Sequence, residues 1–402
     1  MRWCIGTSDD RIVLSLPRPH AGQRRVLDSH ARFRVLACGR RWGKTTLGEH
    51  LSVQAALAGR PVGWFGPTYR FLSEPWRTLR QTLAPVARRM SEDERRIDLI
   101  TGGSISFFSF DDPDAGRGRR LALALVDEAA IVRDLARVWA ETIRPTLTDD
   151  AGQAAFLSTP RGRGDFFALF SQEGEGWASF HAPSAENPHL PAAEIEAARG
   201  DLSERAFRQE YLAEFADEEG AVFGGVREAV DAGRTGDDPP DPTQSYVMGV
   251  DLGRHHDWTV ATVLDPNGRQ VAWRRWRGQT WTVTALRLAE LAHAYDAVAH
   301  VDSTGLGDPV CELLKEQGVR VRPVVFTAES KATMMERLAL RFERQGLRLM
   351  DVPVQTAELE SFAYRTSASG RVVMEGPPHG HDDCVCALAL AAQALKRPAR
   401  VT

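Results

Sequence analysis

Hydrophobic residues in the first half of the chain gather in short, uninterrupted runs, each followed by a polar or glycine-rich segment. Runs of this length are typical of strands buried on both faces of a parallel sheet. Helical patterns lie between them, so the first half is predicted to be an α/β domain. The predicted strands are residues 33–37, 62–65, 121–126 and 156–157; residues 44–58 are a predicted helix, and residues 97–100 and 104–110 a predicted hairpin.

The second half begins with a different order of elements. Three predicted strands come first, with an Asp-Pro-Asn-Gly turn between the second and the third. Helices and strands then alternate, and an apolar helix closes the chain. This order is that of a ribonuclease H-like fold. The predicted strands are residues 246–251, 258–264, 269–276, 297–302 and 319–326; the predicted helices are residues 283–295, 309–317, a stretch from 330, and 384–395.

Residues 231–244 are polar and rich in proline and glycine, which indicates a boundary between two domains. The segment before it, residues 206–215, carries aromatic residues at 207, 211 and 215 and is predicted to be one amphipathic helix whose stripe serves core packing. We therefore expect a first domain at residues 1–216, a linker at 217–244 and a second domain at 245–402.

Composition narrows the class of protein. The hydrophobic fraction of 43% fits a soluble globular protein, and no apolar run is long enough to span a bilayer, so a cytoplasmic protein without a membrane partner is expected. The net charge of −4 does not by itself indicate a nucleic-acid partner. The chain has 46 arginines and four lysines, which suggests a codon bias, so arginine clusters away from a motif are weak evidence for DNA contact.

The first candidate for chemistry is the segment between the first strand and the first helix. Strand, glycine-containing loop and helix form the context that a phosphate-binding loop requires. Lys44 would place a positive charge on the β and γ phosphates, the Thr45 hydroxyl would complete a Mg²⁺ shell, and Gly43 would let the backbone approach closely. The alternative is a helix start with a chance Gly-Lys-Thr, since Cys38 replaces the first glycine of the motif. The predicted nucleotide-binding residues are Gly39, Arg40, Arg41, Trp42, Gly43, Lys44, Thr45 and Thr46.

Two further strands of the first half end in polar residues. Asp127 and Glu128 follow the run at 121–126, where Asp127 would hold Mg²⁺ through water and Glu128 would orient and deprotonate the attacking water. Ser158 and Thr159 end the next strand and could sense a γ-phosphate; the alternative is a turn before Pro160.

Two flanking segments supply the remaining candidates for the nucleotide site. Gln23, upstream of the first strand, could recognise the adenine edge, or lie in a solvated loop. Arg117 and Arg119 stand in a Gly-Arg-rich segment and are candidates for an arginine finger.

In the second half, three aspartates fall where the ribonuclease H-like fold brings carboxylates together. Asp251 ends the first strand, Asp302 ends the fourth, and Asp383 opens the last helix. Each has a simpler explanation as a strand end or a helix cap. Clustered carboxylates repel, so a site that keeps them together needs cations. Two Mg²⁺ or Mn²⁺ ions would there support phosphodiester cleavage. The auxiliary ligands would be Asp257 and Asp382, and Lys331 is a candidate phosphate contact.

A phosphate-binding loop and a ribonuclease H-like half in one chain resemble the large terminase subunit of tailed bacteriophages, prophages and gene transfer agents. The segments that carry the resemblance span about residues 20–392. They are HAGQRRVL, GRRWGKTT, LVDEAA, FLSTPRG, FRQEYLAEF, GVDLG with Asp257, VDSTGLGD and HDD.

The resemblance implies an ASCE-type P-loop ATPase domain followed by a ribonuclease H-like nuclease. Arg40 and Lys44 would contact phosphates, Asp127 and Glu128 would be the Walker B pair, and residues 158–160 would couple hydrolysis to motion. The nuclease acids would be Asp251, Asp302 and Asp383.

The resemblance also implies a function and partners. ATP hydrolysis would drive double-stranded DNA into a viral procapsid, and the nuclease would make the cuts that begin and end packaging. Expected partners are the portal protein, the small terminase subunit and further copies of the chain in a ring, with a monomer possible in solution, all in the cytoplasm of the bacterial host. A helicase-nuclease of DNA repair and a non-enzymatic DNA-binding protein are the alternatives.

Overall fold

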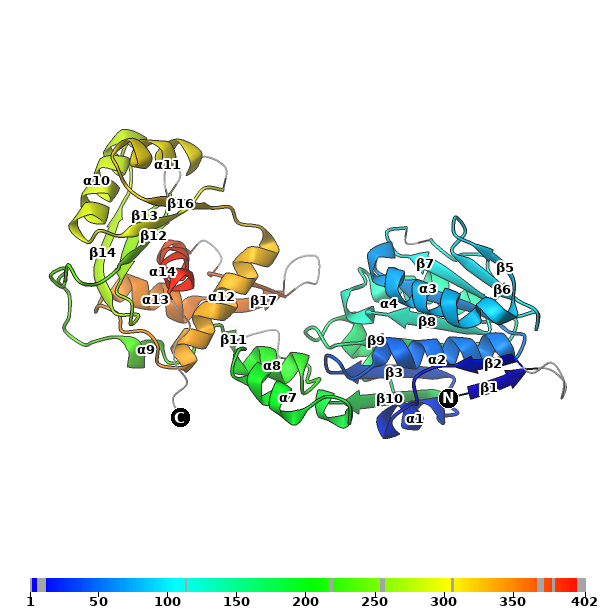
Figure 1. The fold of residues 1–402 in the computed structure, drawn as a ribbon. Helices are drawn as coiled ribbons and strands as arrows, with labels where there is room; N and C mark the ends of the chain where they lie inside the picture. Colours follow the sequence, from blue (N-terminus) through cyan, green and yellow to red (C-terminus); the bar gives the residue numbers. More distant parts are fainter. Residues whose placement is uncertain are drawn as a thin grey trace. The chain divides into compact units, whose positions relative to one another are not determined.

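The computed structural model describes residues 2–5, 12–112, 114–216, 220–253, 257–304, 307–366, 372–377 and 380–395. The chain divides into two compact units (Figure 1). The first comprises Met1–Arg199 and Arg205–Asp217, and the second comprises Gly200–Glu204 and Glu218–Thr402. In the described residues, no helix combines the length and the apolar character that crossing a membrane requires.

The first unit is built on an eight-stranded sheet with strand order β10-β3-β9-β8-β4-β7-β6-β5. The strands from β10 to β7 run parallel, and β6 and β5 extend the sheet antiparallel at one edge. The strands are β3 (Phe33–Cys38), β4 (Pro61–Gly66), β5 (Ala87–Ser91), β6 (Arg96–Leu99), β7 (Ser104–Ser109), β8 (Leu123–Asp127), β9 (Gln153–Ser158) and β10 (Trp177–Ala182).

Both faces of this sheet are buried, which explains the uninterrupted apolar runs. Along β3, Leu36 packs into a cluster with Leu47 of α2 (Lys44–Leu57), whereas Val35 faces the opposite cluster, which contains Phe166 of α6 (Asp165–Phe170). Successive side chains of a strand point to opposite faces, so every position must be apolar when helices cover both. The predicted parallel α/β arrangement is confirmed.

The remaining elements of the first unit are short, apart from α3, and the sequence patterns did not predict most of them. A two-stranded antiparallel sheet, β1 and β2, precedes the first helix. The remaining elements are β1 (Arg2–Ile5), β2 (Ile12–Ser15), α1 (Ala21–Leu27), α3 (Tyr69–Leu83), η1 (Ala84–Val86), η2 (Ala129–Ile131), α4 (Leu135–Arg137), η3 (Val138–Ile143), α5 (Arg144–Thr146), η4 (Ser184–Glu186) and α7 (Ala192–Arg199).

The helix predicted at residues 206–215 is shorter in the structure. Helix α8 spans Glu204–Glu210, and the chain then leaves the helical path, with Ala213 at φ 60°. Phe207 and Tyr211 stack on each other with ring centroids 5.3 Å apart, whereas Phe215 packs against Phe167 at 4.9 Å. The aromatic residues do serve packing, but they belong to two separate clusters, so their spacing of four was not the period of one helix.

The second unit contains a five-stranded sheet with strand order β14-β13-β12-β15-β16. Strand β13 runs antiparallel to both β12 and β14, and β12, β15 and β16 run parallel. The ribonuclease H-like order expected from the sequence is therefore confirmed. The strands are β12 (Val247–Asp251), β13 (Thr259–Leu264), β14 (Gln270–Trp276), β15 (Val298–Asp302) and β16 (Val321–Val324), and a small sheet joins β11 (Gly220–Ala221), β17 (Ala363–Thr366) and β18 (Val372–Glu375).

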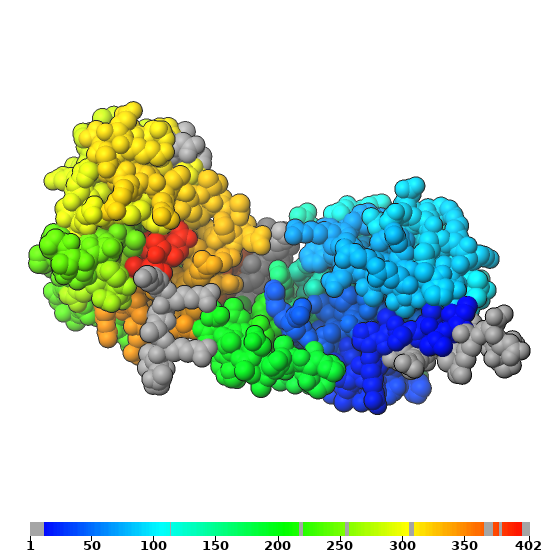
Figure 2. Space-filling model, in the orientation of Figure 1, coloured from blue at the N-terminus to red at the C-terminus, as the bar shows by residue number. Residues whose placement is uncertain are grey.

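Helix α14 is the central helix of this unit and is buried along almost its whole length. Gly249 of β12 permits its close approach, because a Cβ at this position would collide with the backbone of Ala387 and Ala391. On the face of the unit shown in Figure 2, α14 is visible only as a small red patch. The helices of the unit are α9 (Val226–Ala229), α10 (Trp281–Ala294), α11 (Gly307–Glu316), α12 (Ala328–Glu343), α13 (Pro353–Ser361) and α14 (Asp383–Ala394).

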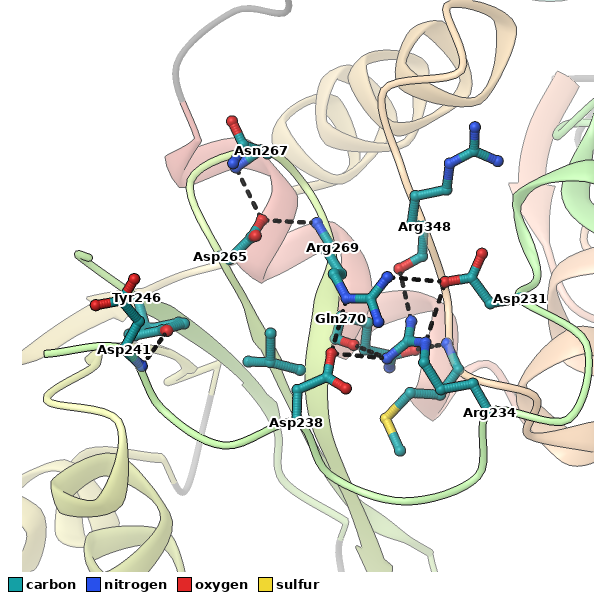
Figure 3. A network of polar contacts seen from close by, with 12 residues as sticks. Asp231, Arg234, Asp238, Asp241, Tyr246, Asp265, Asn267, Arg269, Gln270 and Arg348 are labelled. Atoms are coloured by element: carbon teal, nitrogen blue, oxygen red, sulfur yellow. Dashed lines mark hydrogen bonds and ion pairs between the residues drawn. The ribbon is translucent and has the colours of Figure 1, made fainter. Parts of the chain in front are cut away.

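Most of the segment expected to be a linker packs against the second unit; its first residues, 217–219, lie outside the described part of the chain. Phe223 and Val226 are buried in the core of this unit. Further on, Arg234 bonds Asp231 at 3.1 Å and Asp238 at 3.3 Å, and Arg269 of the hairpin turn reaches the same two carboxylates (Figure 3). Polar composition here reflects an ion-pair network on a folded surface, not a free connector.

Candidate active sites

The loop between β3 and α2 has the backbone of an anion site. Arg41 and Gly43 have positive φ, 61° and 101°. The four carbonyl oxygens of residues 40–43 each lie within hydrogen-bond distance of a side chain from outside the loop. The first amides of α2 have no acceptor within the helix, which leaves them available to an anion. The four side-chain bonds are Ser184 Oγ to Arg40 O at 2.7 Å, Asn187 Nδ2 to Arg41 O at 2.7 Å, His20 Nε2 to Trp42 O at 2.9 Å and Gln23 Nε2 to Gly43 O at 2.9 Å.

Lys44, which begins α2 after β3, lies close to the acids that follow the end of β8. Strand β9 lies between β3 and β8, and Lys44 Nζ lies 2.9 Å from Glu128 Oε1. Asp127 is buried, and this burial raises the pKa of its carboxyl to about 7, with the nearby Glu128 adding to the rise. Ser158 Oγ accepts a hydrogen bond from Ala130 N at 3.1 Å and so links the end of β9 to the segment after Glu128.

Other predicted nucleotide-binding residues have roles within the protein in this structure. The Arg40 guanidinium bonds the Glu210 carboxylate, and Arg40 N donates to Glu210 O at 2.6 Å. The Trp42 side chain is fully buried, with Nε1 3.2 Å from Glu186 Oε2, so only its backbone could face a ligand. Thr45 and Thr46 lie half-buried in the first turn of α2, as a Mg²⁺ contact through Thr45 requires.

Gln23 braces the loop in this structure and does not offer a free edge to a base. Its side chain is 4% exposed, its Oε1 accepts from His20 N at 3.1 Å, and its Nε2 donates to Gly43 O. Each polar end of the amide therefore already makes one bond to the backbone. The side chain is also almost wholly buried, so in this structure Gln23 has a structural role, and the adenine contact expected from the sequence stays a prediction.

Replacing Gln23 with Ala should therefore destabilise the loop without altering base preference. Loss of two buried hydrogen bonds should lower the free energy of unfolding by about 1–3 kcal/mol. Affinity for ATP and for GTP should fall together, since both share the phosphates. Denaturant unfolding and competitive nucleotide binding measure the two effects, with the exposed Gln172→Ala as control. A loss confined to ATP would show instead that the side chain reads adenine.

Arg117 and Arg119 lie in a surface turn. Arg117 is exposed and its Nη1 bonds Asp114 Oδ1 at 3.2 Å; Arg119 is also exposed. Among the described contacts, neither arginine reaches the carboxylates at the nucleotide site, Asp127 and Glu128. The choice of an arginine finger stays a prediction.

In the second unit, the sheet order brings the predicted acids together. Asp251 and Asp302 end the adjacent parallel strands β12 and β15, and Asp383 begins α14, which packs on β12. A cavity of about 280 Å³ opens between them. Its charged lining is Asp251, Asp257, Asp302, Lys331, Asp382 and Asp383.

Burial and mutual repulsion act on these carboxylates. Burial raises the pKa of Asp251 well above its ordinary value, with Asp383 and Asp302 adding to the rise, and burial raises the pKa of Asp383 to about 6. Asp383 Oδ2 is buried without a hydrogen bond among the described residues, and His381 Nδ1 lies 3.4 Å from it. Carboxylate oxygens are the ligands that Mg²⁺ and Mn²⁺ prefer, so the residues present fit divalent cations.

The carboxylates do not form a preassembled coordination sphere. Across the described ranges, no three His, Cys, Asp or Glu side chains already converge in metal-binding geometry. Lys331 Nζ instead lies 2.9 Å from Asp382 Oδ2, at the edge of the cavity. A cation entering the site would therefore compete with this ammonium for Asp382.

Lys331→Met should accordingly tighten Mn²⁺ binding. A half-exposed ion pair is worth about 1 kcal/mol, so the affinity of the DNA-free protein should rise by about fivefold. Isothermal titration calorimetry measures the change. Lys315→Met is the matched control, because Lys315 pairs with Glu312 on the exposed side of α11. Weaker Mn²⁺ binding by Lys331→Met would contradict this competition.

The sequence did not reveal the residues that support these sites. His20 could have been suspected, because it begins α1 in a capping box with Gln23. Ser184, Asn187 and Glu358 carry no comparable local signal. Only the packing of distant elements brings them to the loop and to the start of α14.

The fold and the two sites define a class of protein in which a P-loop ATPase unit precedes a ribonuclease H-like nuclease unit. Family comparisons agree over most of the chain. Residues 35–229 match the N-terminal domain of the terminase large subunit, T4likevirus-type, and residues 248–395 match the terminase RNaseH-like domain. The terminase large subunit of Thermus phage G20c is 30% identical over 436 residues, covering 93% of this chain and 87% of that protein.

The chain therefore belongs to the family of phage large terminase subunits, with an ATPase and a nuclease domain. The large subunit of Escherichia phage T5 is 28% identical over 250 residues, which covers 59% of this chain and 57% of that protein. A solved large terminase from another thermophilic bacteriophage shares the fold, with a TM-score of 0.61 at 16% identity, over 94% of this chain and 99% of that one. The resemblance stated from the sequence motifs is confirmed.

Proposed function

We propose that this chain uses ATP hydrolysis to move double-stranded DNA into a viral procapsid and cuts that DNA with its second unit at the start and the end of packaging. The observation that carries the proposal is the presence of two distinct acidic sites in one chain of the terminase family. One site lies beside Lys44 at the N-terminus of a helix. The other surrounds the cavity that Asp251 lines.

In the first site, ATP phosphates would bind the loop amides and Lys44. Mg²⁺ would be held by Thr45 and Asp127, and Glu128 would act as the base for the attacking water. Lys44 now pairs with Glu128, so phosphate binding would have to draw the ammonium away and free this carboxylate. The exchange would keep Glu128 paired until nucleotide is present.

In the second site, Asp251, Asp302 and Asp383 would hold two divalent cations, Mg²⁺ or Mn²⁺, with Asp257 and Asp382 as auxiliary ligands. Such ions, when bound, activate water and stabilise the leaving oxygen. The protein's own part would be to hold these carboxylates together: the pairing of β12 with β15 sets the spacing of Asp251 and Asp302, and the packing of α14 on β12 places Asp383.

The proposed partners follow from the function. A packaging motor must ignore sequence, so its DNA contacts would be mainly with phosphates. A ring of subunits would act on the portal protein of the procapsid, and a small terminase subunit would select the site, all in the cytoplasm of the bacterial host.

The test is a pair of assays on the full chain. The wild-type protein should cleave plasmid DNA with Mn²⁺ or Mg²⁺. It should also hydrolyse ATP in the presence of double-stranded DNA without separating the two strands. A wild-type protein that cuts with neither metal would overturn the nuclease assignment. ATP-dependent strand separation would favour a helicase-nuclease of DNA repair.

A further inference from the structure

The start of helix α14 is unusual because its N-cap residue, Asp382, does not cap it. An aspartate at a helix N-terminus ordinarily accepts hydrogen bonds from the first amides. Here the Asp382 side chain makes no capping bond and instead pairs with Lys331. Asp383 Oδ2 is buried and makes no hydrogen bond in the described residues, although His381 Nδ1 lies 3.4 Å from it. The aspartates therefore leave the first amides of the helix to another acceptor.

Glu358 is that acceptor. It lies on α13, is 6% exposed, and its Oε2 accepts a hydrogen bond from Cys384 N at 2.8 Å. Its negative charge also suits the positive end of the α14 dipole. Cys384 directly follows Asp383, so this bond holds the backbone of the first helical turn next to the Asp383 carboxylate.

The Glu358 carboxylate is itself supported. Its Oε1 lies 3.3 Å from Arg275 Nη2, and the Arg275 guanidinium lies 4.0 Å from the centre of the Trp258 ring. A buried carboxylate needs such a partner to remain charged. Trp258 is next to Asp257 in the chain, so these contacts run from α13 through β14 to the neighbour of a residue that lines the carboxylate cavity.

We propose that Glu358 is a positioning residue of the nuclease site. By accepting the Cys384 amide, it anchors the first turn of α14 next to Asp383 and so keeps that carboxylate in place for a divalent cation. The inference rests on the proposed nuclease function and adds a residue that lies outside the cavity lining. For this role, the side chain must be long enough to place an acceptor oxygen against the Cys384 amide; its negative charge matters less.

Two substitutions separate reach from charge. Glu358→Asp keeps the charge that balances Arg275 but is one methylene too short to reach the Cys384 amide. Glu358→Gln keeps an acceptor oxygen at the same reach and loses the charge. Changes behind a metal ligand typically weaken metal affinity by about 10- to 100-fold. Glu358→Asp should therefore bind Mn²⁺ about tenfold more weakly, and Glu358→Gln should stay within about threefold of wild type.

Calorimetric titration of Mn²⁺ into DNA-free full-length protein is the primary measurement. The Mn²⁺ concentration for half-maximal plasmid cleavage should shift in parallel, with the rate at saturating Mn²⁺ restored in Glu358→Asp. Thermal unfolding of each variant ensures that folded proteins are compared. Glu360→Asp and Glu360→Gln are matched controls, since Glu360 lies on the same helix and pairs with the exposed Arg227.

The outcomes are distinct. Wild-type Mn²⁺ affinity in folded Glu358→Asp, or equal losses in Glu358→Asp and Glu358→Gln, would overturn the proposal. A wrong nuclease assignment would give a different result. Wild-type protein would then bind no Mn²⁺, or would bind Mn²⁺ that Asp302→Ala binds equally well.

Discussion

Asp302→Ala is expected to abolish metal-dependent cleavage of plasmid DNA and to leave ATP hydrolysis at the wild-type rate. Asp302 ends β15 beside Asp251 on β12, and it lines the carboxylate cavity. Substitutions one shell removed from a metal cost about 10- to 100-fold, so loss of a direct ligand should cost about a hundredfold or more. The ATPase residues belong to the other unit, whose sheet and core are separate.

The control for this substitution lies near the opposite end of the same strand. Asp296 is exposed and pairs with Arg320 at 2.9 Å, away from the cavity lining. Asp296→Ala should cut plasmid at the wild-type rate. Cleavage by Asp302→Ala at more than about a tenth of the wild-type rate would exclude Asp302 as a ligand. Equal losses in both variants would indicate damage to the unit and not to its site.

Lys44→Ala is expected to have the complementary effect, with ATP hydrolysis lost and plasmid cleavage retained. Lys44 begins α2, and its ammonium lies 2.9 Å from Glu128 in a half-buried position. Removal of one preorganised positive or hydrogen-bonding group from such a site costs about 10²- to 10³-fold in rate. Release of phosphate from ATP, measured with and without DNA, gives the result.

Lys315→Ala is the control for charge alone, because it removes one of the chain's four lysines from an exposed helix. Its ATP hydrolysis should equal that of wild type. Hydrolysis by Lys44→Ala at the wild-type rate would contradict the phosphate-binding assignment of this loop. Loss of cleavage together with hydrolysis would indicate that the two active sites are not independent.

Local patterns predicted the elements near the sites well because those elements have a clear physical signature. Strands β3, β8 and β12 are largely buried, so they read as apolar runs, and their functional residues stand where each run ends. Patterns failed where polar composition had another cause. The ion pairs of Arg234 and Arg269 made a folded segment resemble a linker, and two aromatic clusters resembled one amphipathic helix.

The sequence by itself determined the fold class and the positions of the candidate acids and of Lys44, because the order of elements along the chain and the burial of each strand show in local hydrophobic periodicity. Tertiary structure alone decided how these groups are supported and paired. Ser184 reaches Arg40 across 144 residues and Glu358 reaches Cys384 across 26. A buried polar group must find a partner wherever packing supplies one, and that partner leaves no trace in the local pattern of either segment.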